Sequence, residues 1–235
     1  MHVDELRLQR LTRHLAKWDL RSFGLVHALS EVTAAMPHLF DVDGAGILLA
    51  DDEHVLRHVA STDASANALE ALQESEGRGP CVQSLVEDMV VATPDVLEDP
   101  RWPEIGKLFA EKGIRSILGA PVHLAGAPLG SLNVYKSTVH DWDESDHRAL
   151  TAFETLVERL ITASLALERS EAVATQLQEA LRARIEIERS VGIVMALEDL
   201  DALDVFQRVR RMARSARKPI REVASDIIKY KKITY

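Results

Sequence analysis

The stretch LQEALRARIEIERSVGIVMALEDLDALDVFQRVRRMARSARKPIREVASDIIKY spans residues 177–230 and predicts three helices. The first ends near Leu197. Asp201 is expected to cap the second, because an aspartate before a periodic apolar stretch is a common N-cap. The inward face of this second helix carries Leu203, Phe206, Val209 and Ala213. Pro219 is expected to begin the last helix, which turns inward Val223, Ala224, Ile227 and Ile228. Three helices of this size enclose a small core, so they need each other or a partner chain.

This stretch resembles the ANTAR domain. The positions that match the family pattern, in order and with its spacing, are Arg184, Ile187, Gly192-Ile193-Val194-Met195, Phe206, Arg210-Arg211 and Val223-Ala224. The resemblance implies a three-helix RNA-binding module of the kind found in bacterial antiterminators. It also implies that a dimer binds paired hairpins in a nascent transcript and prevents a terminator from forming.

Two positions depart from the family pattern. The family usually has Gln-Ala-Lys before the glycine, and this chain has Arg189-Ser190-Val191. It usually has alanine before the phenylalanine, and here the residue is Val205. A missing lysine would remove one phosphate contact. Arg189 lies two residues earlier and points elsewhere on the helix, so whether Val191 weakens RNA binding stays open.

Basic residues are concentrated in this C-terminal part. From residue 177 onward the chain has 13 basic and 9 acidic side chains, a net charge of +4, whereas the whole chain carries −9. An acidic body with a basic tail favours a polyanionic partner for the tail, and a solvated helical face is the alternative. Together with the resemblance, the charges predict RNA contacts by Arg184, Arg189, Arg210, Arg211, Arg214, Arg217 and Lys218.

A long helix is expected before this module. Residues 143–197 contain no proline, and their only glycine is Gly192. Apolar and small residues repeat at steps of three and four, at Leu156, Leu160, Ala163, Leu167, Ser170, Ala174, Leu177 and Leu181. Such a seam favours a homodimeric coiled coil, and packing against the C-terminal helices is the alternative.

The middle of the chain predicts an α+β domain with a mostly antiparallel sheet. Strands are expected over 45–50, 55–60, 116–122 and 130–135, and helices over 64–74, 80–87 and 103–112. Two further helices are expected before residue 40. The first has its apolar residues at Leu8, Leu11, Leu15 and Trp18, and the second ends near Pro37.

This middle region resembles a GAF domain of the type found before ANTAR units in actinobacteria. The residues that match are Gly77-Arg78-Gly79-Pro80-Cys81, Asp99-Pro100-Arg101-Trp102-Pro103, Gly113-Ile114-Arg115-Ser116 and Leu129-Gly130-Ser131-Leu132-Asn133-Val134-Tyr135. The resemblance implies an antiparallel sheet flanked by helices and a cavity for an unidentified small ligand. Cys81, Trp102 and Tyr135 are the candidate residues for this pocket.

The chain has a single cysteine, which cannot form an internal disulfide or a cysteine-rich zinc site. Cys81 is expected to be a small buried residue, and a redox-sensitive thiol at a helix start is the alternative. His54 and His58 have a spacing that suits a metal, but no acidic partner is obvious. A phosphate loop and a nucleophile elbow are both missing. We therefore predict no catalytic residue, no metal ligand and no fixed cofactor.

These observations predict a sensor domain over 1–165, a coiled-coil linker over 166–176 and an RNA-binding domain over 177–235. The sequence has no long apolar run, and its first residues do not form a basic region followed by an apolar run. It therefore favours a location in the cytoplasm without a membrane anchor. The predicted function is a signal-responsive, homodimeric antitermination regulator. The alternative is a regulator whose helical tail binds a protein partner and no RNA, and the salt dependence of binding distinguishes the two.

Overall fold

The structure is a computed structural model of the chain. It describes residues 20–39, 41–51, 56–167 and 171–231, together with a few isolated positions before residue 20. The apolar residues of the predicted first helix, as well as His54, lie outside the described residues.

One antiparallel sheet of five strands forms the centre of the N-terminal domain, in the order β2-β1-β5-β4-β3. Its strands are β1 (Gly44–Ala50), β2 (Leu56–Ser61), β3 (Val91–Thr93), β4 (Ser116–Leu124) and β5 (Ala127–Lys136). Four of them were predicted from the sequence. The three-residue strand β3 was not, because it is too short to have a recognisable alternation.

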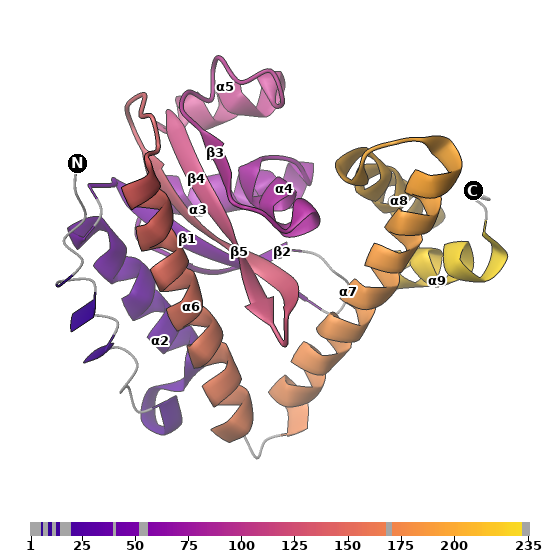
Figure 1. The fold of residues 1–235 in the computed structure, drawn as a ribbon, viewed down its shortest axis with the longest axis horizontal. Coiled ribbons are helices and arrows are strands. Elements are labelled where there is room, and N and C mark those ends of the chain that lie inside the picture. The colour runs from indigo at the N-terminus through magenta and orange to yellow at the C-terminus, as the bar shows by residue number, and fades with distance from the viewer. Residues whose placement is uncertain are drawn as a thin grey trace.

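Helices cover both faces of this sheet (Figure 1). The first face packs against α2 (Leu20–Ala35) and α6 (Glu144–Leu167), with the short 3-10 helix η1 (Met36–His38) after α2. The second face packs against α3 (Ala64–Glu76), α4 (Pro80–Glu87) and α5 (Pro103–Glu111). Every residue of β1 is buried because it has a helix on each side, which explains its continuous apolar sequence.

The connection from α3 to α4 is fixed by local chemistry. The Asp63 carboxylate begins α3 by accepting hydrogen bonds from the backbone N–H groups of Ser65 and Ala66. Gly77 ends the helix in the left-handed region, with φ of 64°. Pro80 then occupies the first turn of α4, where its missing N–H costs nothing. The C-terminal end of α3 and the start of α4 therefore lie close together.

Three helices form the C-terminal part: α7 (Glu171–Glu198), α8 (Ala202–Ala216) and α9 (Ile220–Tyr230). Asp201 caps α8 as predicted, since its carboxylate accepts from the N–H of Asp204. The predicted inward residues are buried, except that Leu203 and Ile228 are half-buried.

The helix predicted over 143–197 is present as two helices. α6 ends at Leu167 and α7 begins at Glu171, and the two diverge from a common end (Figure 1). Leu156 and Leu160 of the predicted seam lie in the core of the N-terminal domain, whereas Ala163 is exposed. The physical reason is that α6 follows the sheet beside α2, while α7 contacts β5 and packs mainly against α8 and α9. A straight helix cannot follow both surfaces, and the homodimeric coiled coil stays a prediction.

Within the described residues, no helix combines the length and apolar character that crossing a membrane requires.

Candidate nucleic-acid interface and sensor interior

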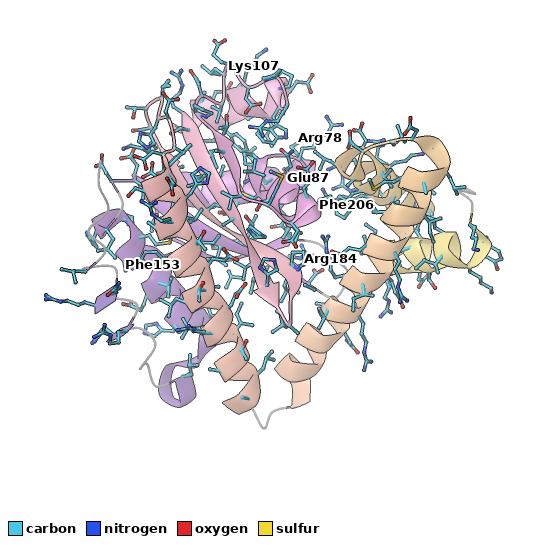
Figure 2. The ribbon with its side chains drawn as sticks, in the orientation of Figure 1. Arg78, Glu87, Lys107, Phe153, Arg184 and Phe206 are labelled. Carbon is cyan, nitrogen blue, oxygen red and sulfur yellow. The ribbon has the colours of Figure 1, made fainter. Side chains whose placement is uncertain are left out.

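The C-terminal helices share one apolar core with the N-terminal domain. Cys81, Val82 and Leu85 of α4 lie in the same buried cluster as Ile187 of α7 and Phe206 of α8. Figure 2 places Phe206 on the side of α8 that faces α4. The cluster also contains residues from β1 and β2, namely Leu48, Ala50 and Leu56. The C-terminal helices are therefore packed on the sensor domain.

Arg184 crosses this interface (Figure 2). Its side chain is 2% exposed. Its Nη2 donates to the carbonyl oxygen of Leu85 at 2.7 Å, and its Nε donates to Glu188 Oε1 at 2.7 Å. The Leu85 carbonyl lies in the last turn of α4, where carbonyl groups lack partners within their own helix. Burial lowers the pKa of Arg184, and the Glu188 carboxylate opposes that shift.

The end of α3 receives a second set of contacts, all from α8. Arg210 Nη2 donates to the carbonyl oxygen of Glu74 at 2.9 Å. Arg214 Nη2 donates to that of Ser75 at 3.3 Å, and the Gln207 amide donates to that of Gly77. The pKa of Arg210 falls to about 10, first because the guanidinium is desolvated and then because Arg214 is close. Two helix ends of the sensor domain thus hold three of the predicted RNA-binding arginines.

Arg214 is exposed despite its contact with Ser75, and so are the other four predicted residues, namely Arg189, Arg211, Arg217 and Lys218. Arg211 lines an open groove of about 710 Å³ on the outer side of α8. Arg217 and Lys218 line a cleft of about 580 Å³ between the two domains, together with Arg210 and Arg214. Lys218 also lies 3.6 Å from the Asp226 carboxylate. We call Arg184, Arg210 and Arg214 the held group, because they donate to carbonyl oxygens of the N-terminal domain. The other four residues are called the exposed group, although Arg214 is exposed as well.

Both departures from the ANTAR pattern lie in the shared core. Val191 is 8% exposed and Val205 is fully buried. A lysine at position 191 would bring an ammonium group into an apolar environment, which is unfavourable without a partner. The valine is thus explained by the packing of this helix.

Cys81 lies at the start of α4, inside the sensor domain. The Gln73 amide contacts it twice: Gln73 Nε2 donates to Cys81 Sγ at 2.5 Å, and the Cys81 N–H donates to Gln73 Oε1 at 2.8 Å. Burial and the nearby Glu70 carboxylate raise the pKa of the thiol well above its usual value. Cys81 is therefore a neutral, buried thiol. The prediction from the sequence that it is a small buried residue is confirmed.

A buried polar group next to this cysteine was not found from the sequence. Glu70 of α3 is fully buried, and its Oε1 accepts from Asn133 Nδ2 at 3.1 Å. Ser131 Oγ donates to Asn133 Oδ1 at 2.6 Å. Burial raises the pKa of Glu70 to about 8, and its Oε2 has no hydrogen-bond partner among the described residues. The sequence gives no signal for this group because 63 residues separate Glu70 from Asn133.

Trp102 and Tyr135 lie in a different apolar cluster from Cys81. The Arg101 guanidinium lies 4.2 Å from the centre of the Trp102 ring. The Tyr135 hydroxyl donates to Asp63 Oδ1 at 3.0 Å, and burial together with this carboxylate raises the pKa of the tyrosine to about 12. The three predicted pocket residues are all buried but do not form one group, so the ligand pocket stays a prediction.

Comparison with known proteins identifies both parts of the chain. The family model described as "GAF domain" matches residues 24–161, and the model described as "ANTAR domain" matches residues 175–228. The "Nif-specific regulatory protein" of Azospirillum brasilense is 24% identical over 201 residues, which cover 82% of this chain. The chain spans 32% of that relative's length.

Solved structures resemble the N-terminal domain in fold. A free methionine-R-sulfoxide reductase from Neisseria meningitidis aligns with a TM-score of 0.54 at 20% identity, over 68% of this chain and 89% of its own. The GAF domain of a phosphoenolpyruvate-protein phosphotransferase from Acinetobacter aligns with a TM-score of 0.54 at 17% identity, over 68% and 93%. At these identities the likeness concerns the fold alone.

Proposed function

The chain belongs to the GAF domain family and carries an ANTAR domain after it, and from this architecture we propose a signal-responsive RNA-binding regulator. The ANTAR domain binds paired hairpins of a nascent transcript as a dimer and acts by transcription antitermination. A small molecule bound by the GAF domain is the signal. A protein that acts on nascent transcripts works in the cytoplasm, and the proposal requires no catalytic step.

The seven basic residues support the RNA part of the proposal. Guanidinium groups bind phosphates in a fork geometry and stack on unpaired bases, both of which RNA hairpins present. Five of these residues are exposed, and Arg211 lies beside a groove on the outer face of α8. A dimer would hold two hairpins at once and gain from their high effective concentration.

One observation carries the regulatory part, namely that Arg184, Arg210 and Arg214 donate to backbone carbonyls of the GAF domain. Arg184 is buried and Arg210 is half-buried in these contacts, so a phosphate reaches their guanidinium groups only after the carbonyls release them. RNA and the GAF domain therefore compete for the same side chains. The observed arrangement is then the state with low RNA affinity, and a signal that separates the domains raises the affinity.

A second candidate function follows from the shared apolar core. The faces of α7, α8 and α9 that form this core together with α4 are apolar, and such faces could bind another protein after release. Binding of this kind depends little on salt, whereas binding through several phosphates weakens steeply as salt rises.

The test is binding of the full chain to RNAs with paired hairpins over a salt series, with the mass measured by light scattering. We expect salt-sensitive binding by a dimer. Changing both Arg189 and Arg211 to alanine should weaken it about tenfold. Lys107→Ala, an exposed change on α5, is the matched control. Salt-insensitive binding, or equal affinity of the double variant and the control, would contradict the RNA interface.

A further inference from the structure

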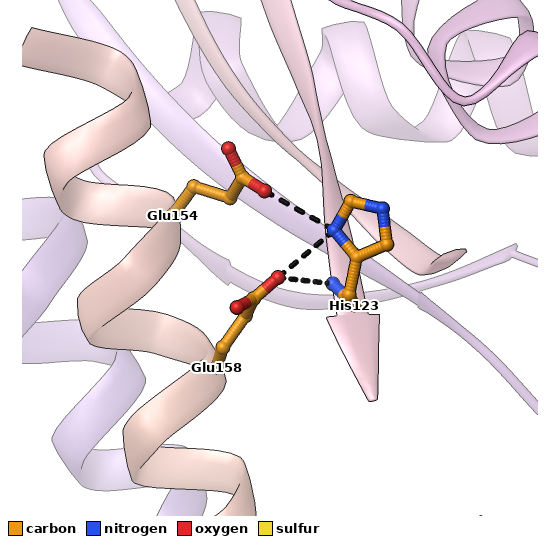
Figure 3. A group of neighbouring side chains, drawn as sticks. All are labelled: His123, Glu154 and Glu158. Atoms are coloured by element: carbon orange, nitrogen blue, oxygen red, sulfur yellow. Dashed lines mark hydrogen bonds and ion pairs between the residues drawn. The ribbon is translucent and has the colours of Figure 1, made fainter. Parts of the chain in front are cut away.

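A histidine and two glutamates meet on the face of the GAF domain that carries α6 (Figure 3). His123 lies near the end of β4, and Glu154 and Glu158 are four residues apart on α6, so both reach the same side of that helix. The distance from His123 Nδ1 is 3.2 Å to Glu154 Oε1 and 2.9 Å to Glu158 Oε1. One ligand atom from each of the three residues lies within 4.8 Å of the others.

The second ring nitrogen of His123 has a carboxylate partner of its own. His123 Nε2 lies 2.6 Å from Asp88 Oδ1, and Asp88 belongs to a third element, the residue that ends α4. A histidine that binds a metal usually donates its other N–H to a carboxylate or carbonyl in this way. The Glu158 carboxylate is oriented as well, because the His123 backbone N–H donates to its Oε1 at 2.9 Å.

The charges around the imidazole are unbalanced. A neutral imidazole has one N–H, so if Nε2–H serves Asp88, the Nδ1 lone pair faces two carboxylates. A second proton would satisfy both sides but still leave one positive charge among three acidic groups. A divalent cation at Nδ1 would remove both the lone-pair repulsion and the charge excess.

We propose that His123 Nδ1, Glu154 and Glu158 bind one divalent transition-metal cation, with Asp88 as the hydrogen-bond partner that fixes the imidazole. One nitrogen and two carboxylate oxygens suit Zn²⁺, whose bonds to them are about 2.0–2.2 Å long, and water completes the coordination. The three side chains are 23%, 14% and 30% exposed, so an ion can reach them from solvent. The site joins β4 to α6 and, through Asp88, to α4. It is independent of RNA binding.

The same geometry places the ion near the domain interface. Asp88 follows Leu85 by three residues, and the carbonyl of Leu85 is the one that holds Arg184. The group of His123, Glu154 and Glu158 was not recognised from the sequence because 31 and 35 residues separate His123 from the two glutamates. His58, which the sequence analysis weighed as a ligand, is exposed on β2.

The test uses the full chain after treatment with a chelator, with Zn²⁺ as the probe in a calorimetric titration near neutral pH. The chain has nine histidines, so weak binding elsewhere is expected, and the specific site is defined by matched variants. Glu158→Gln should lose the tightest equivalent or weaken it at least tenfold. Glu144→Gln, on the same helix and 85% exposed, should bind like the parent. Asp88→Asn should keep the stoichiometry and weaken binding about tenfold, since asparagine tolerates the φ of 53° at this position.

Thermal unfolding with and without Zn²⁺ provides a second readout. The parent and Glu144→Gln should gain stability with the metal, and Glu158→Gln should not. Should Glu158→Gln unfold early even without metal, Glu154→Gln removes another ligand and serves instead. Equal Zn²⁺ affinity of the ligand variants and Glu144→Gln would overturn the site, as would the lack of any equimolar binding by the parent.

Discussion

Arg184 and Arg189 lie five residues apart on α7, yet the first is buried in the domain interface and the second is exposed. The same contrast recurs on α8, where Arg210 donates to the Glu74 carbonyl and its neighbour Arg211 faces solvent. Side chains of one type on one helix thus have two different environments. The inward arginines donate to carbonyl groups at the ends of α3 and α4, which have no hydrogen-bond partner within their own helix. The outward arginines stay available to a polyanion.

The difference suggests that charge alone does not define a binding surface. The held group joins the ANTAR domain to the GAF domain, and under the proposed function the exposed group makes the first contact with RNA. In this account, recognition begins at the exposed residues and becomes complete when the held residues are released. The following predictions separate the two groups.

The largest effect is expected from Arg184→Met, which keeps much of the apolar stem and removes the donor. The Leu85 carbonyl would lose its buried partner, so the free energy of unfolding should fall by about 2–3 kcal/mol. Arg182→Met, at an exposed position of the same helix, should change it by less than about 0.5 kcal/mol. Urea unfolding of both variants measures the difference. Equal stabilities would mean that the Arg184 contact does not hold the interface.

Val191→Lys restores the lysine of the ANTAR pattern at a buried position. An ammonium group in the shared core should lower the free energy of unfolding by about 2 kcal/mol, because it must move into water or lose its charge. Ile185→Lys, at a position 43% exposed on the same helix, adds the same group without this cost. We expect hydrogen exchange along α4 to accelerate in the first variant alone, and unchanged exchange would speak against the shared core.

Gln207→Ala removes the amide that donates to the Gly77 carbonyl. The expected loss is about 1 kcal/mol, the usual net value of one hydrogen bond. Ser215→Ala, exposed on the same helix, is the control. Chemical denaturation with a probe in α8 would record the loss. If the free energy of unfolding of Gln207→Ala fell no further than that of the control, this hydrogen bond would not stabilise the interface.

The smallest effect on stability is expected from the exposed group. Arg189→Ala and Arg211→Ala should each change the free energy of unfolding by less than about 0.5 kcal/mol. Each should also lower the slope of log affinity for RNA against log salt by about 1. Filter binding at several salt concentrations measures that slope. A large loss of stability in either variant would show that the outward arginines have structural partners as well.

Most of the fold could be predicted from local patterns. The alternation and length of the apolar runs identified four strands, and Asp201 and Pro219 marked the starts of α8 and α9. The division between α6 and α7 could not be predicted, because the apolar seam continues across it and the separation is set by the two different surfaces on which the helices pack.

The candidate site was predictable in its residue types and not in its arrangement. Arg184, Arg210 and Arg211 follow from the ANTAR pattern, and the other basic positions follow from the charge of the C-terminal part. Which of them face inward depends on how the C-terminal helices pack on α3 and α4. The buried pair Glu70 and Asn133 has no local spacing. Glu154 and Glu158 are four residues apart on one helix, but tertiary structure alone brings His123 to them.

The most direct test of the competition between RNA and the GAF domain uses two glycines. Gly77 and Gly113 both have left-handed φ angles, of 64° and 78°, so alanine costs about 1 kcal/mol of backbone strain at either. A Cβ at Gly77 would coincide with the Arg210 guanidinium, whereas at Gly113 it would meet open space. Both variants keep all seven basic residues. Measured with one paired-hairpin RNA at one salt concentration, Gly77→Ala should bind several-fold more tightly than Gly113→Ala. Equal or weaker binding by Gly77→Ala would contradict the claim that the GAF domain withholds these arginines from RNA.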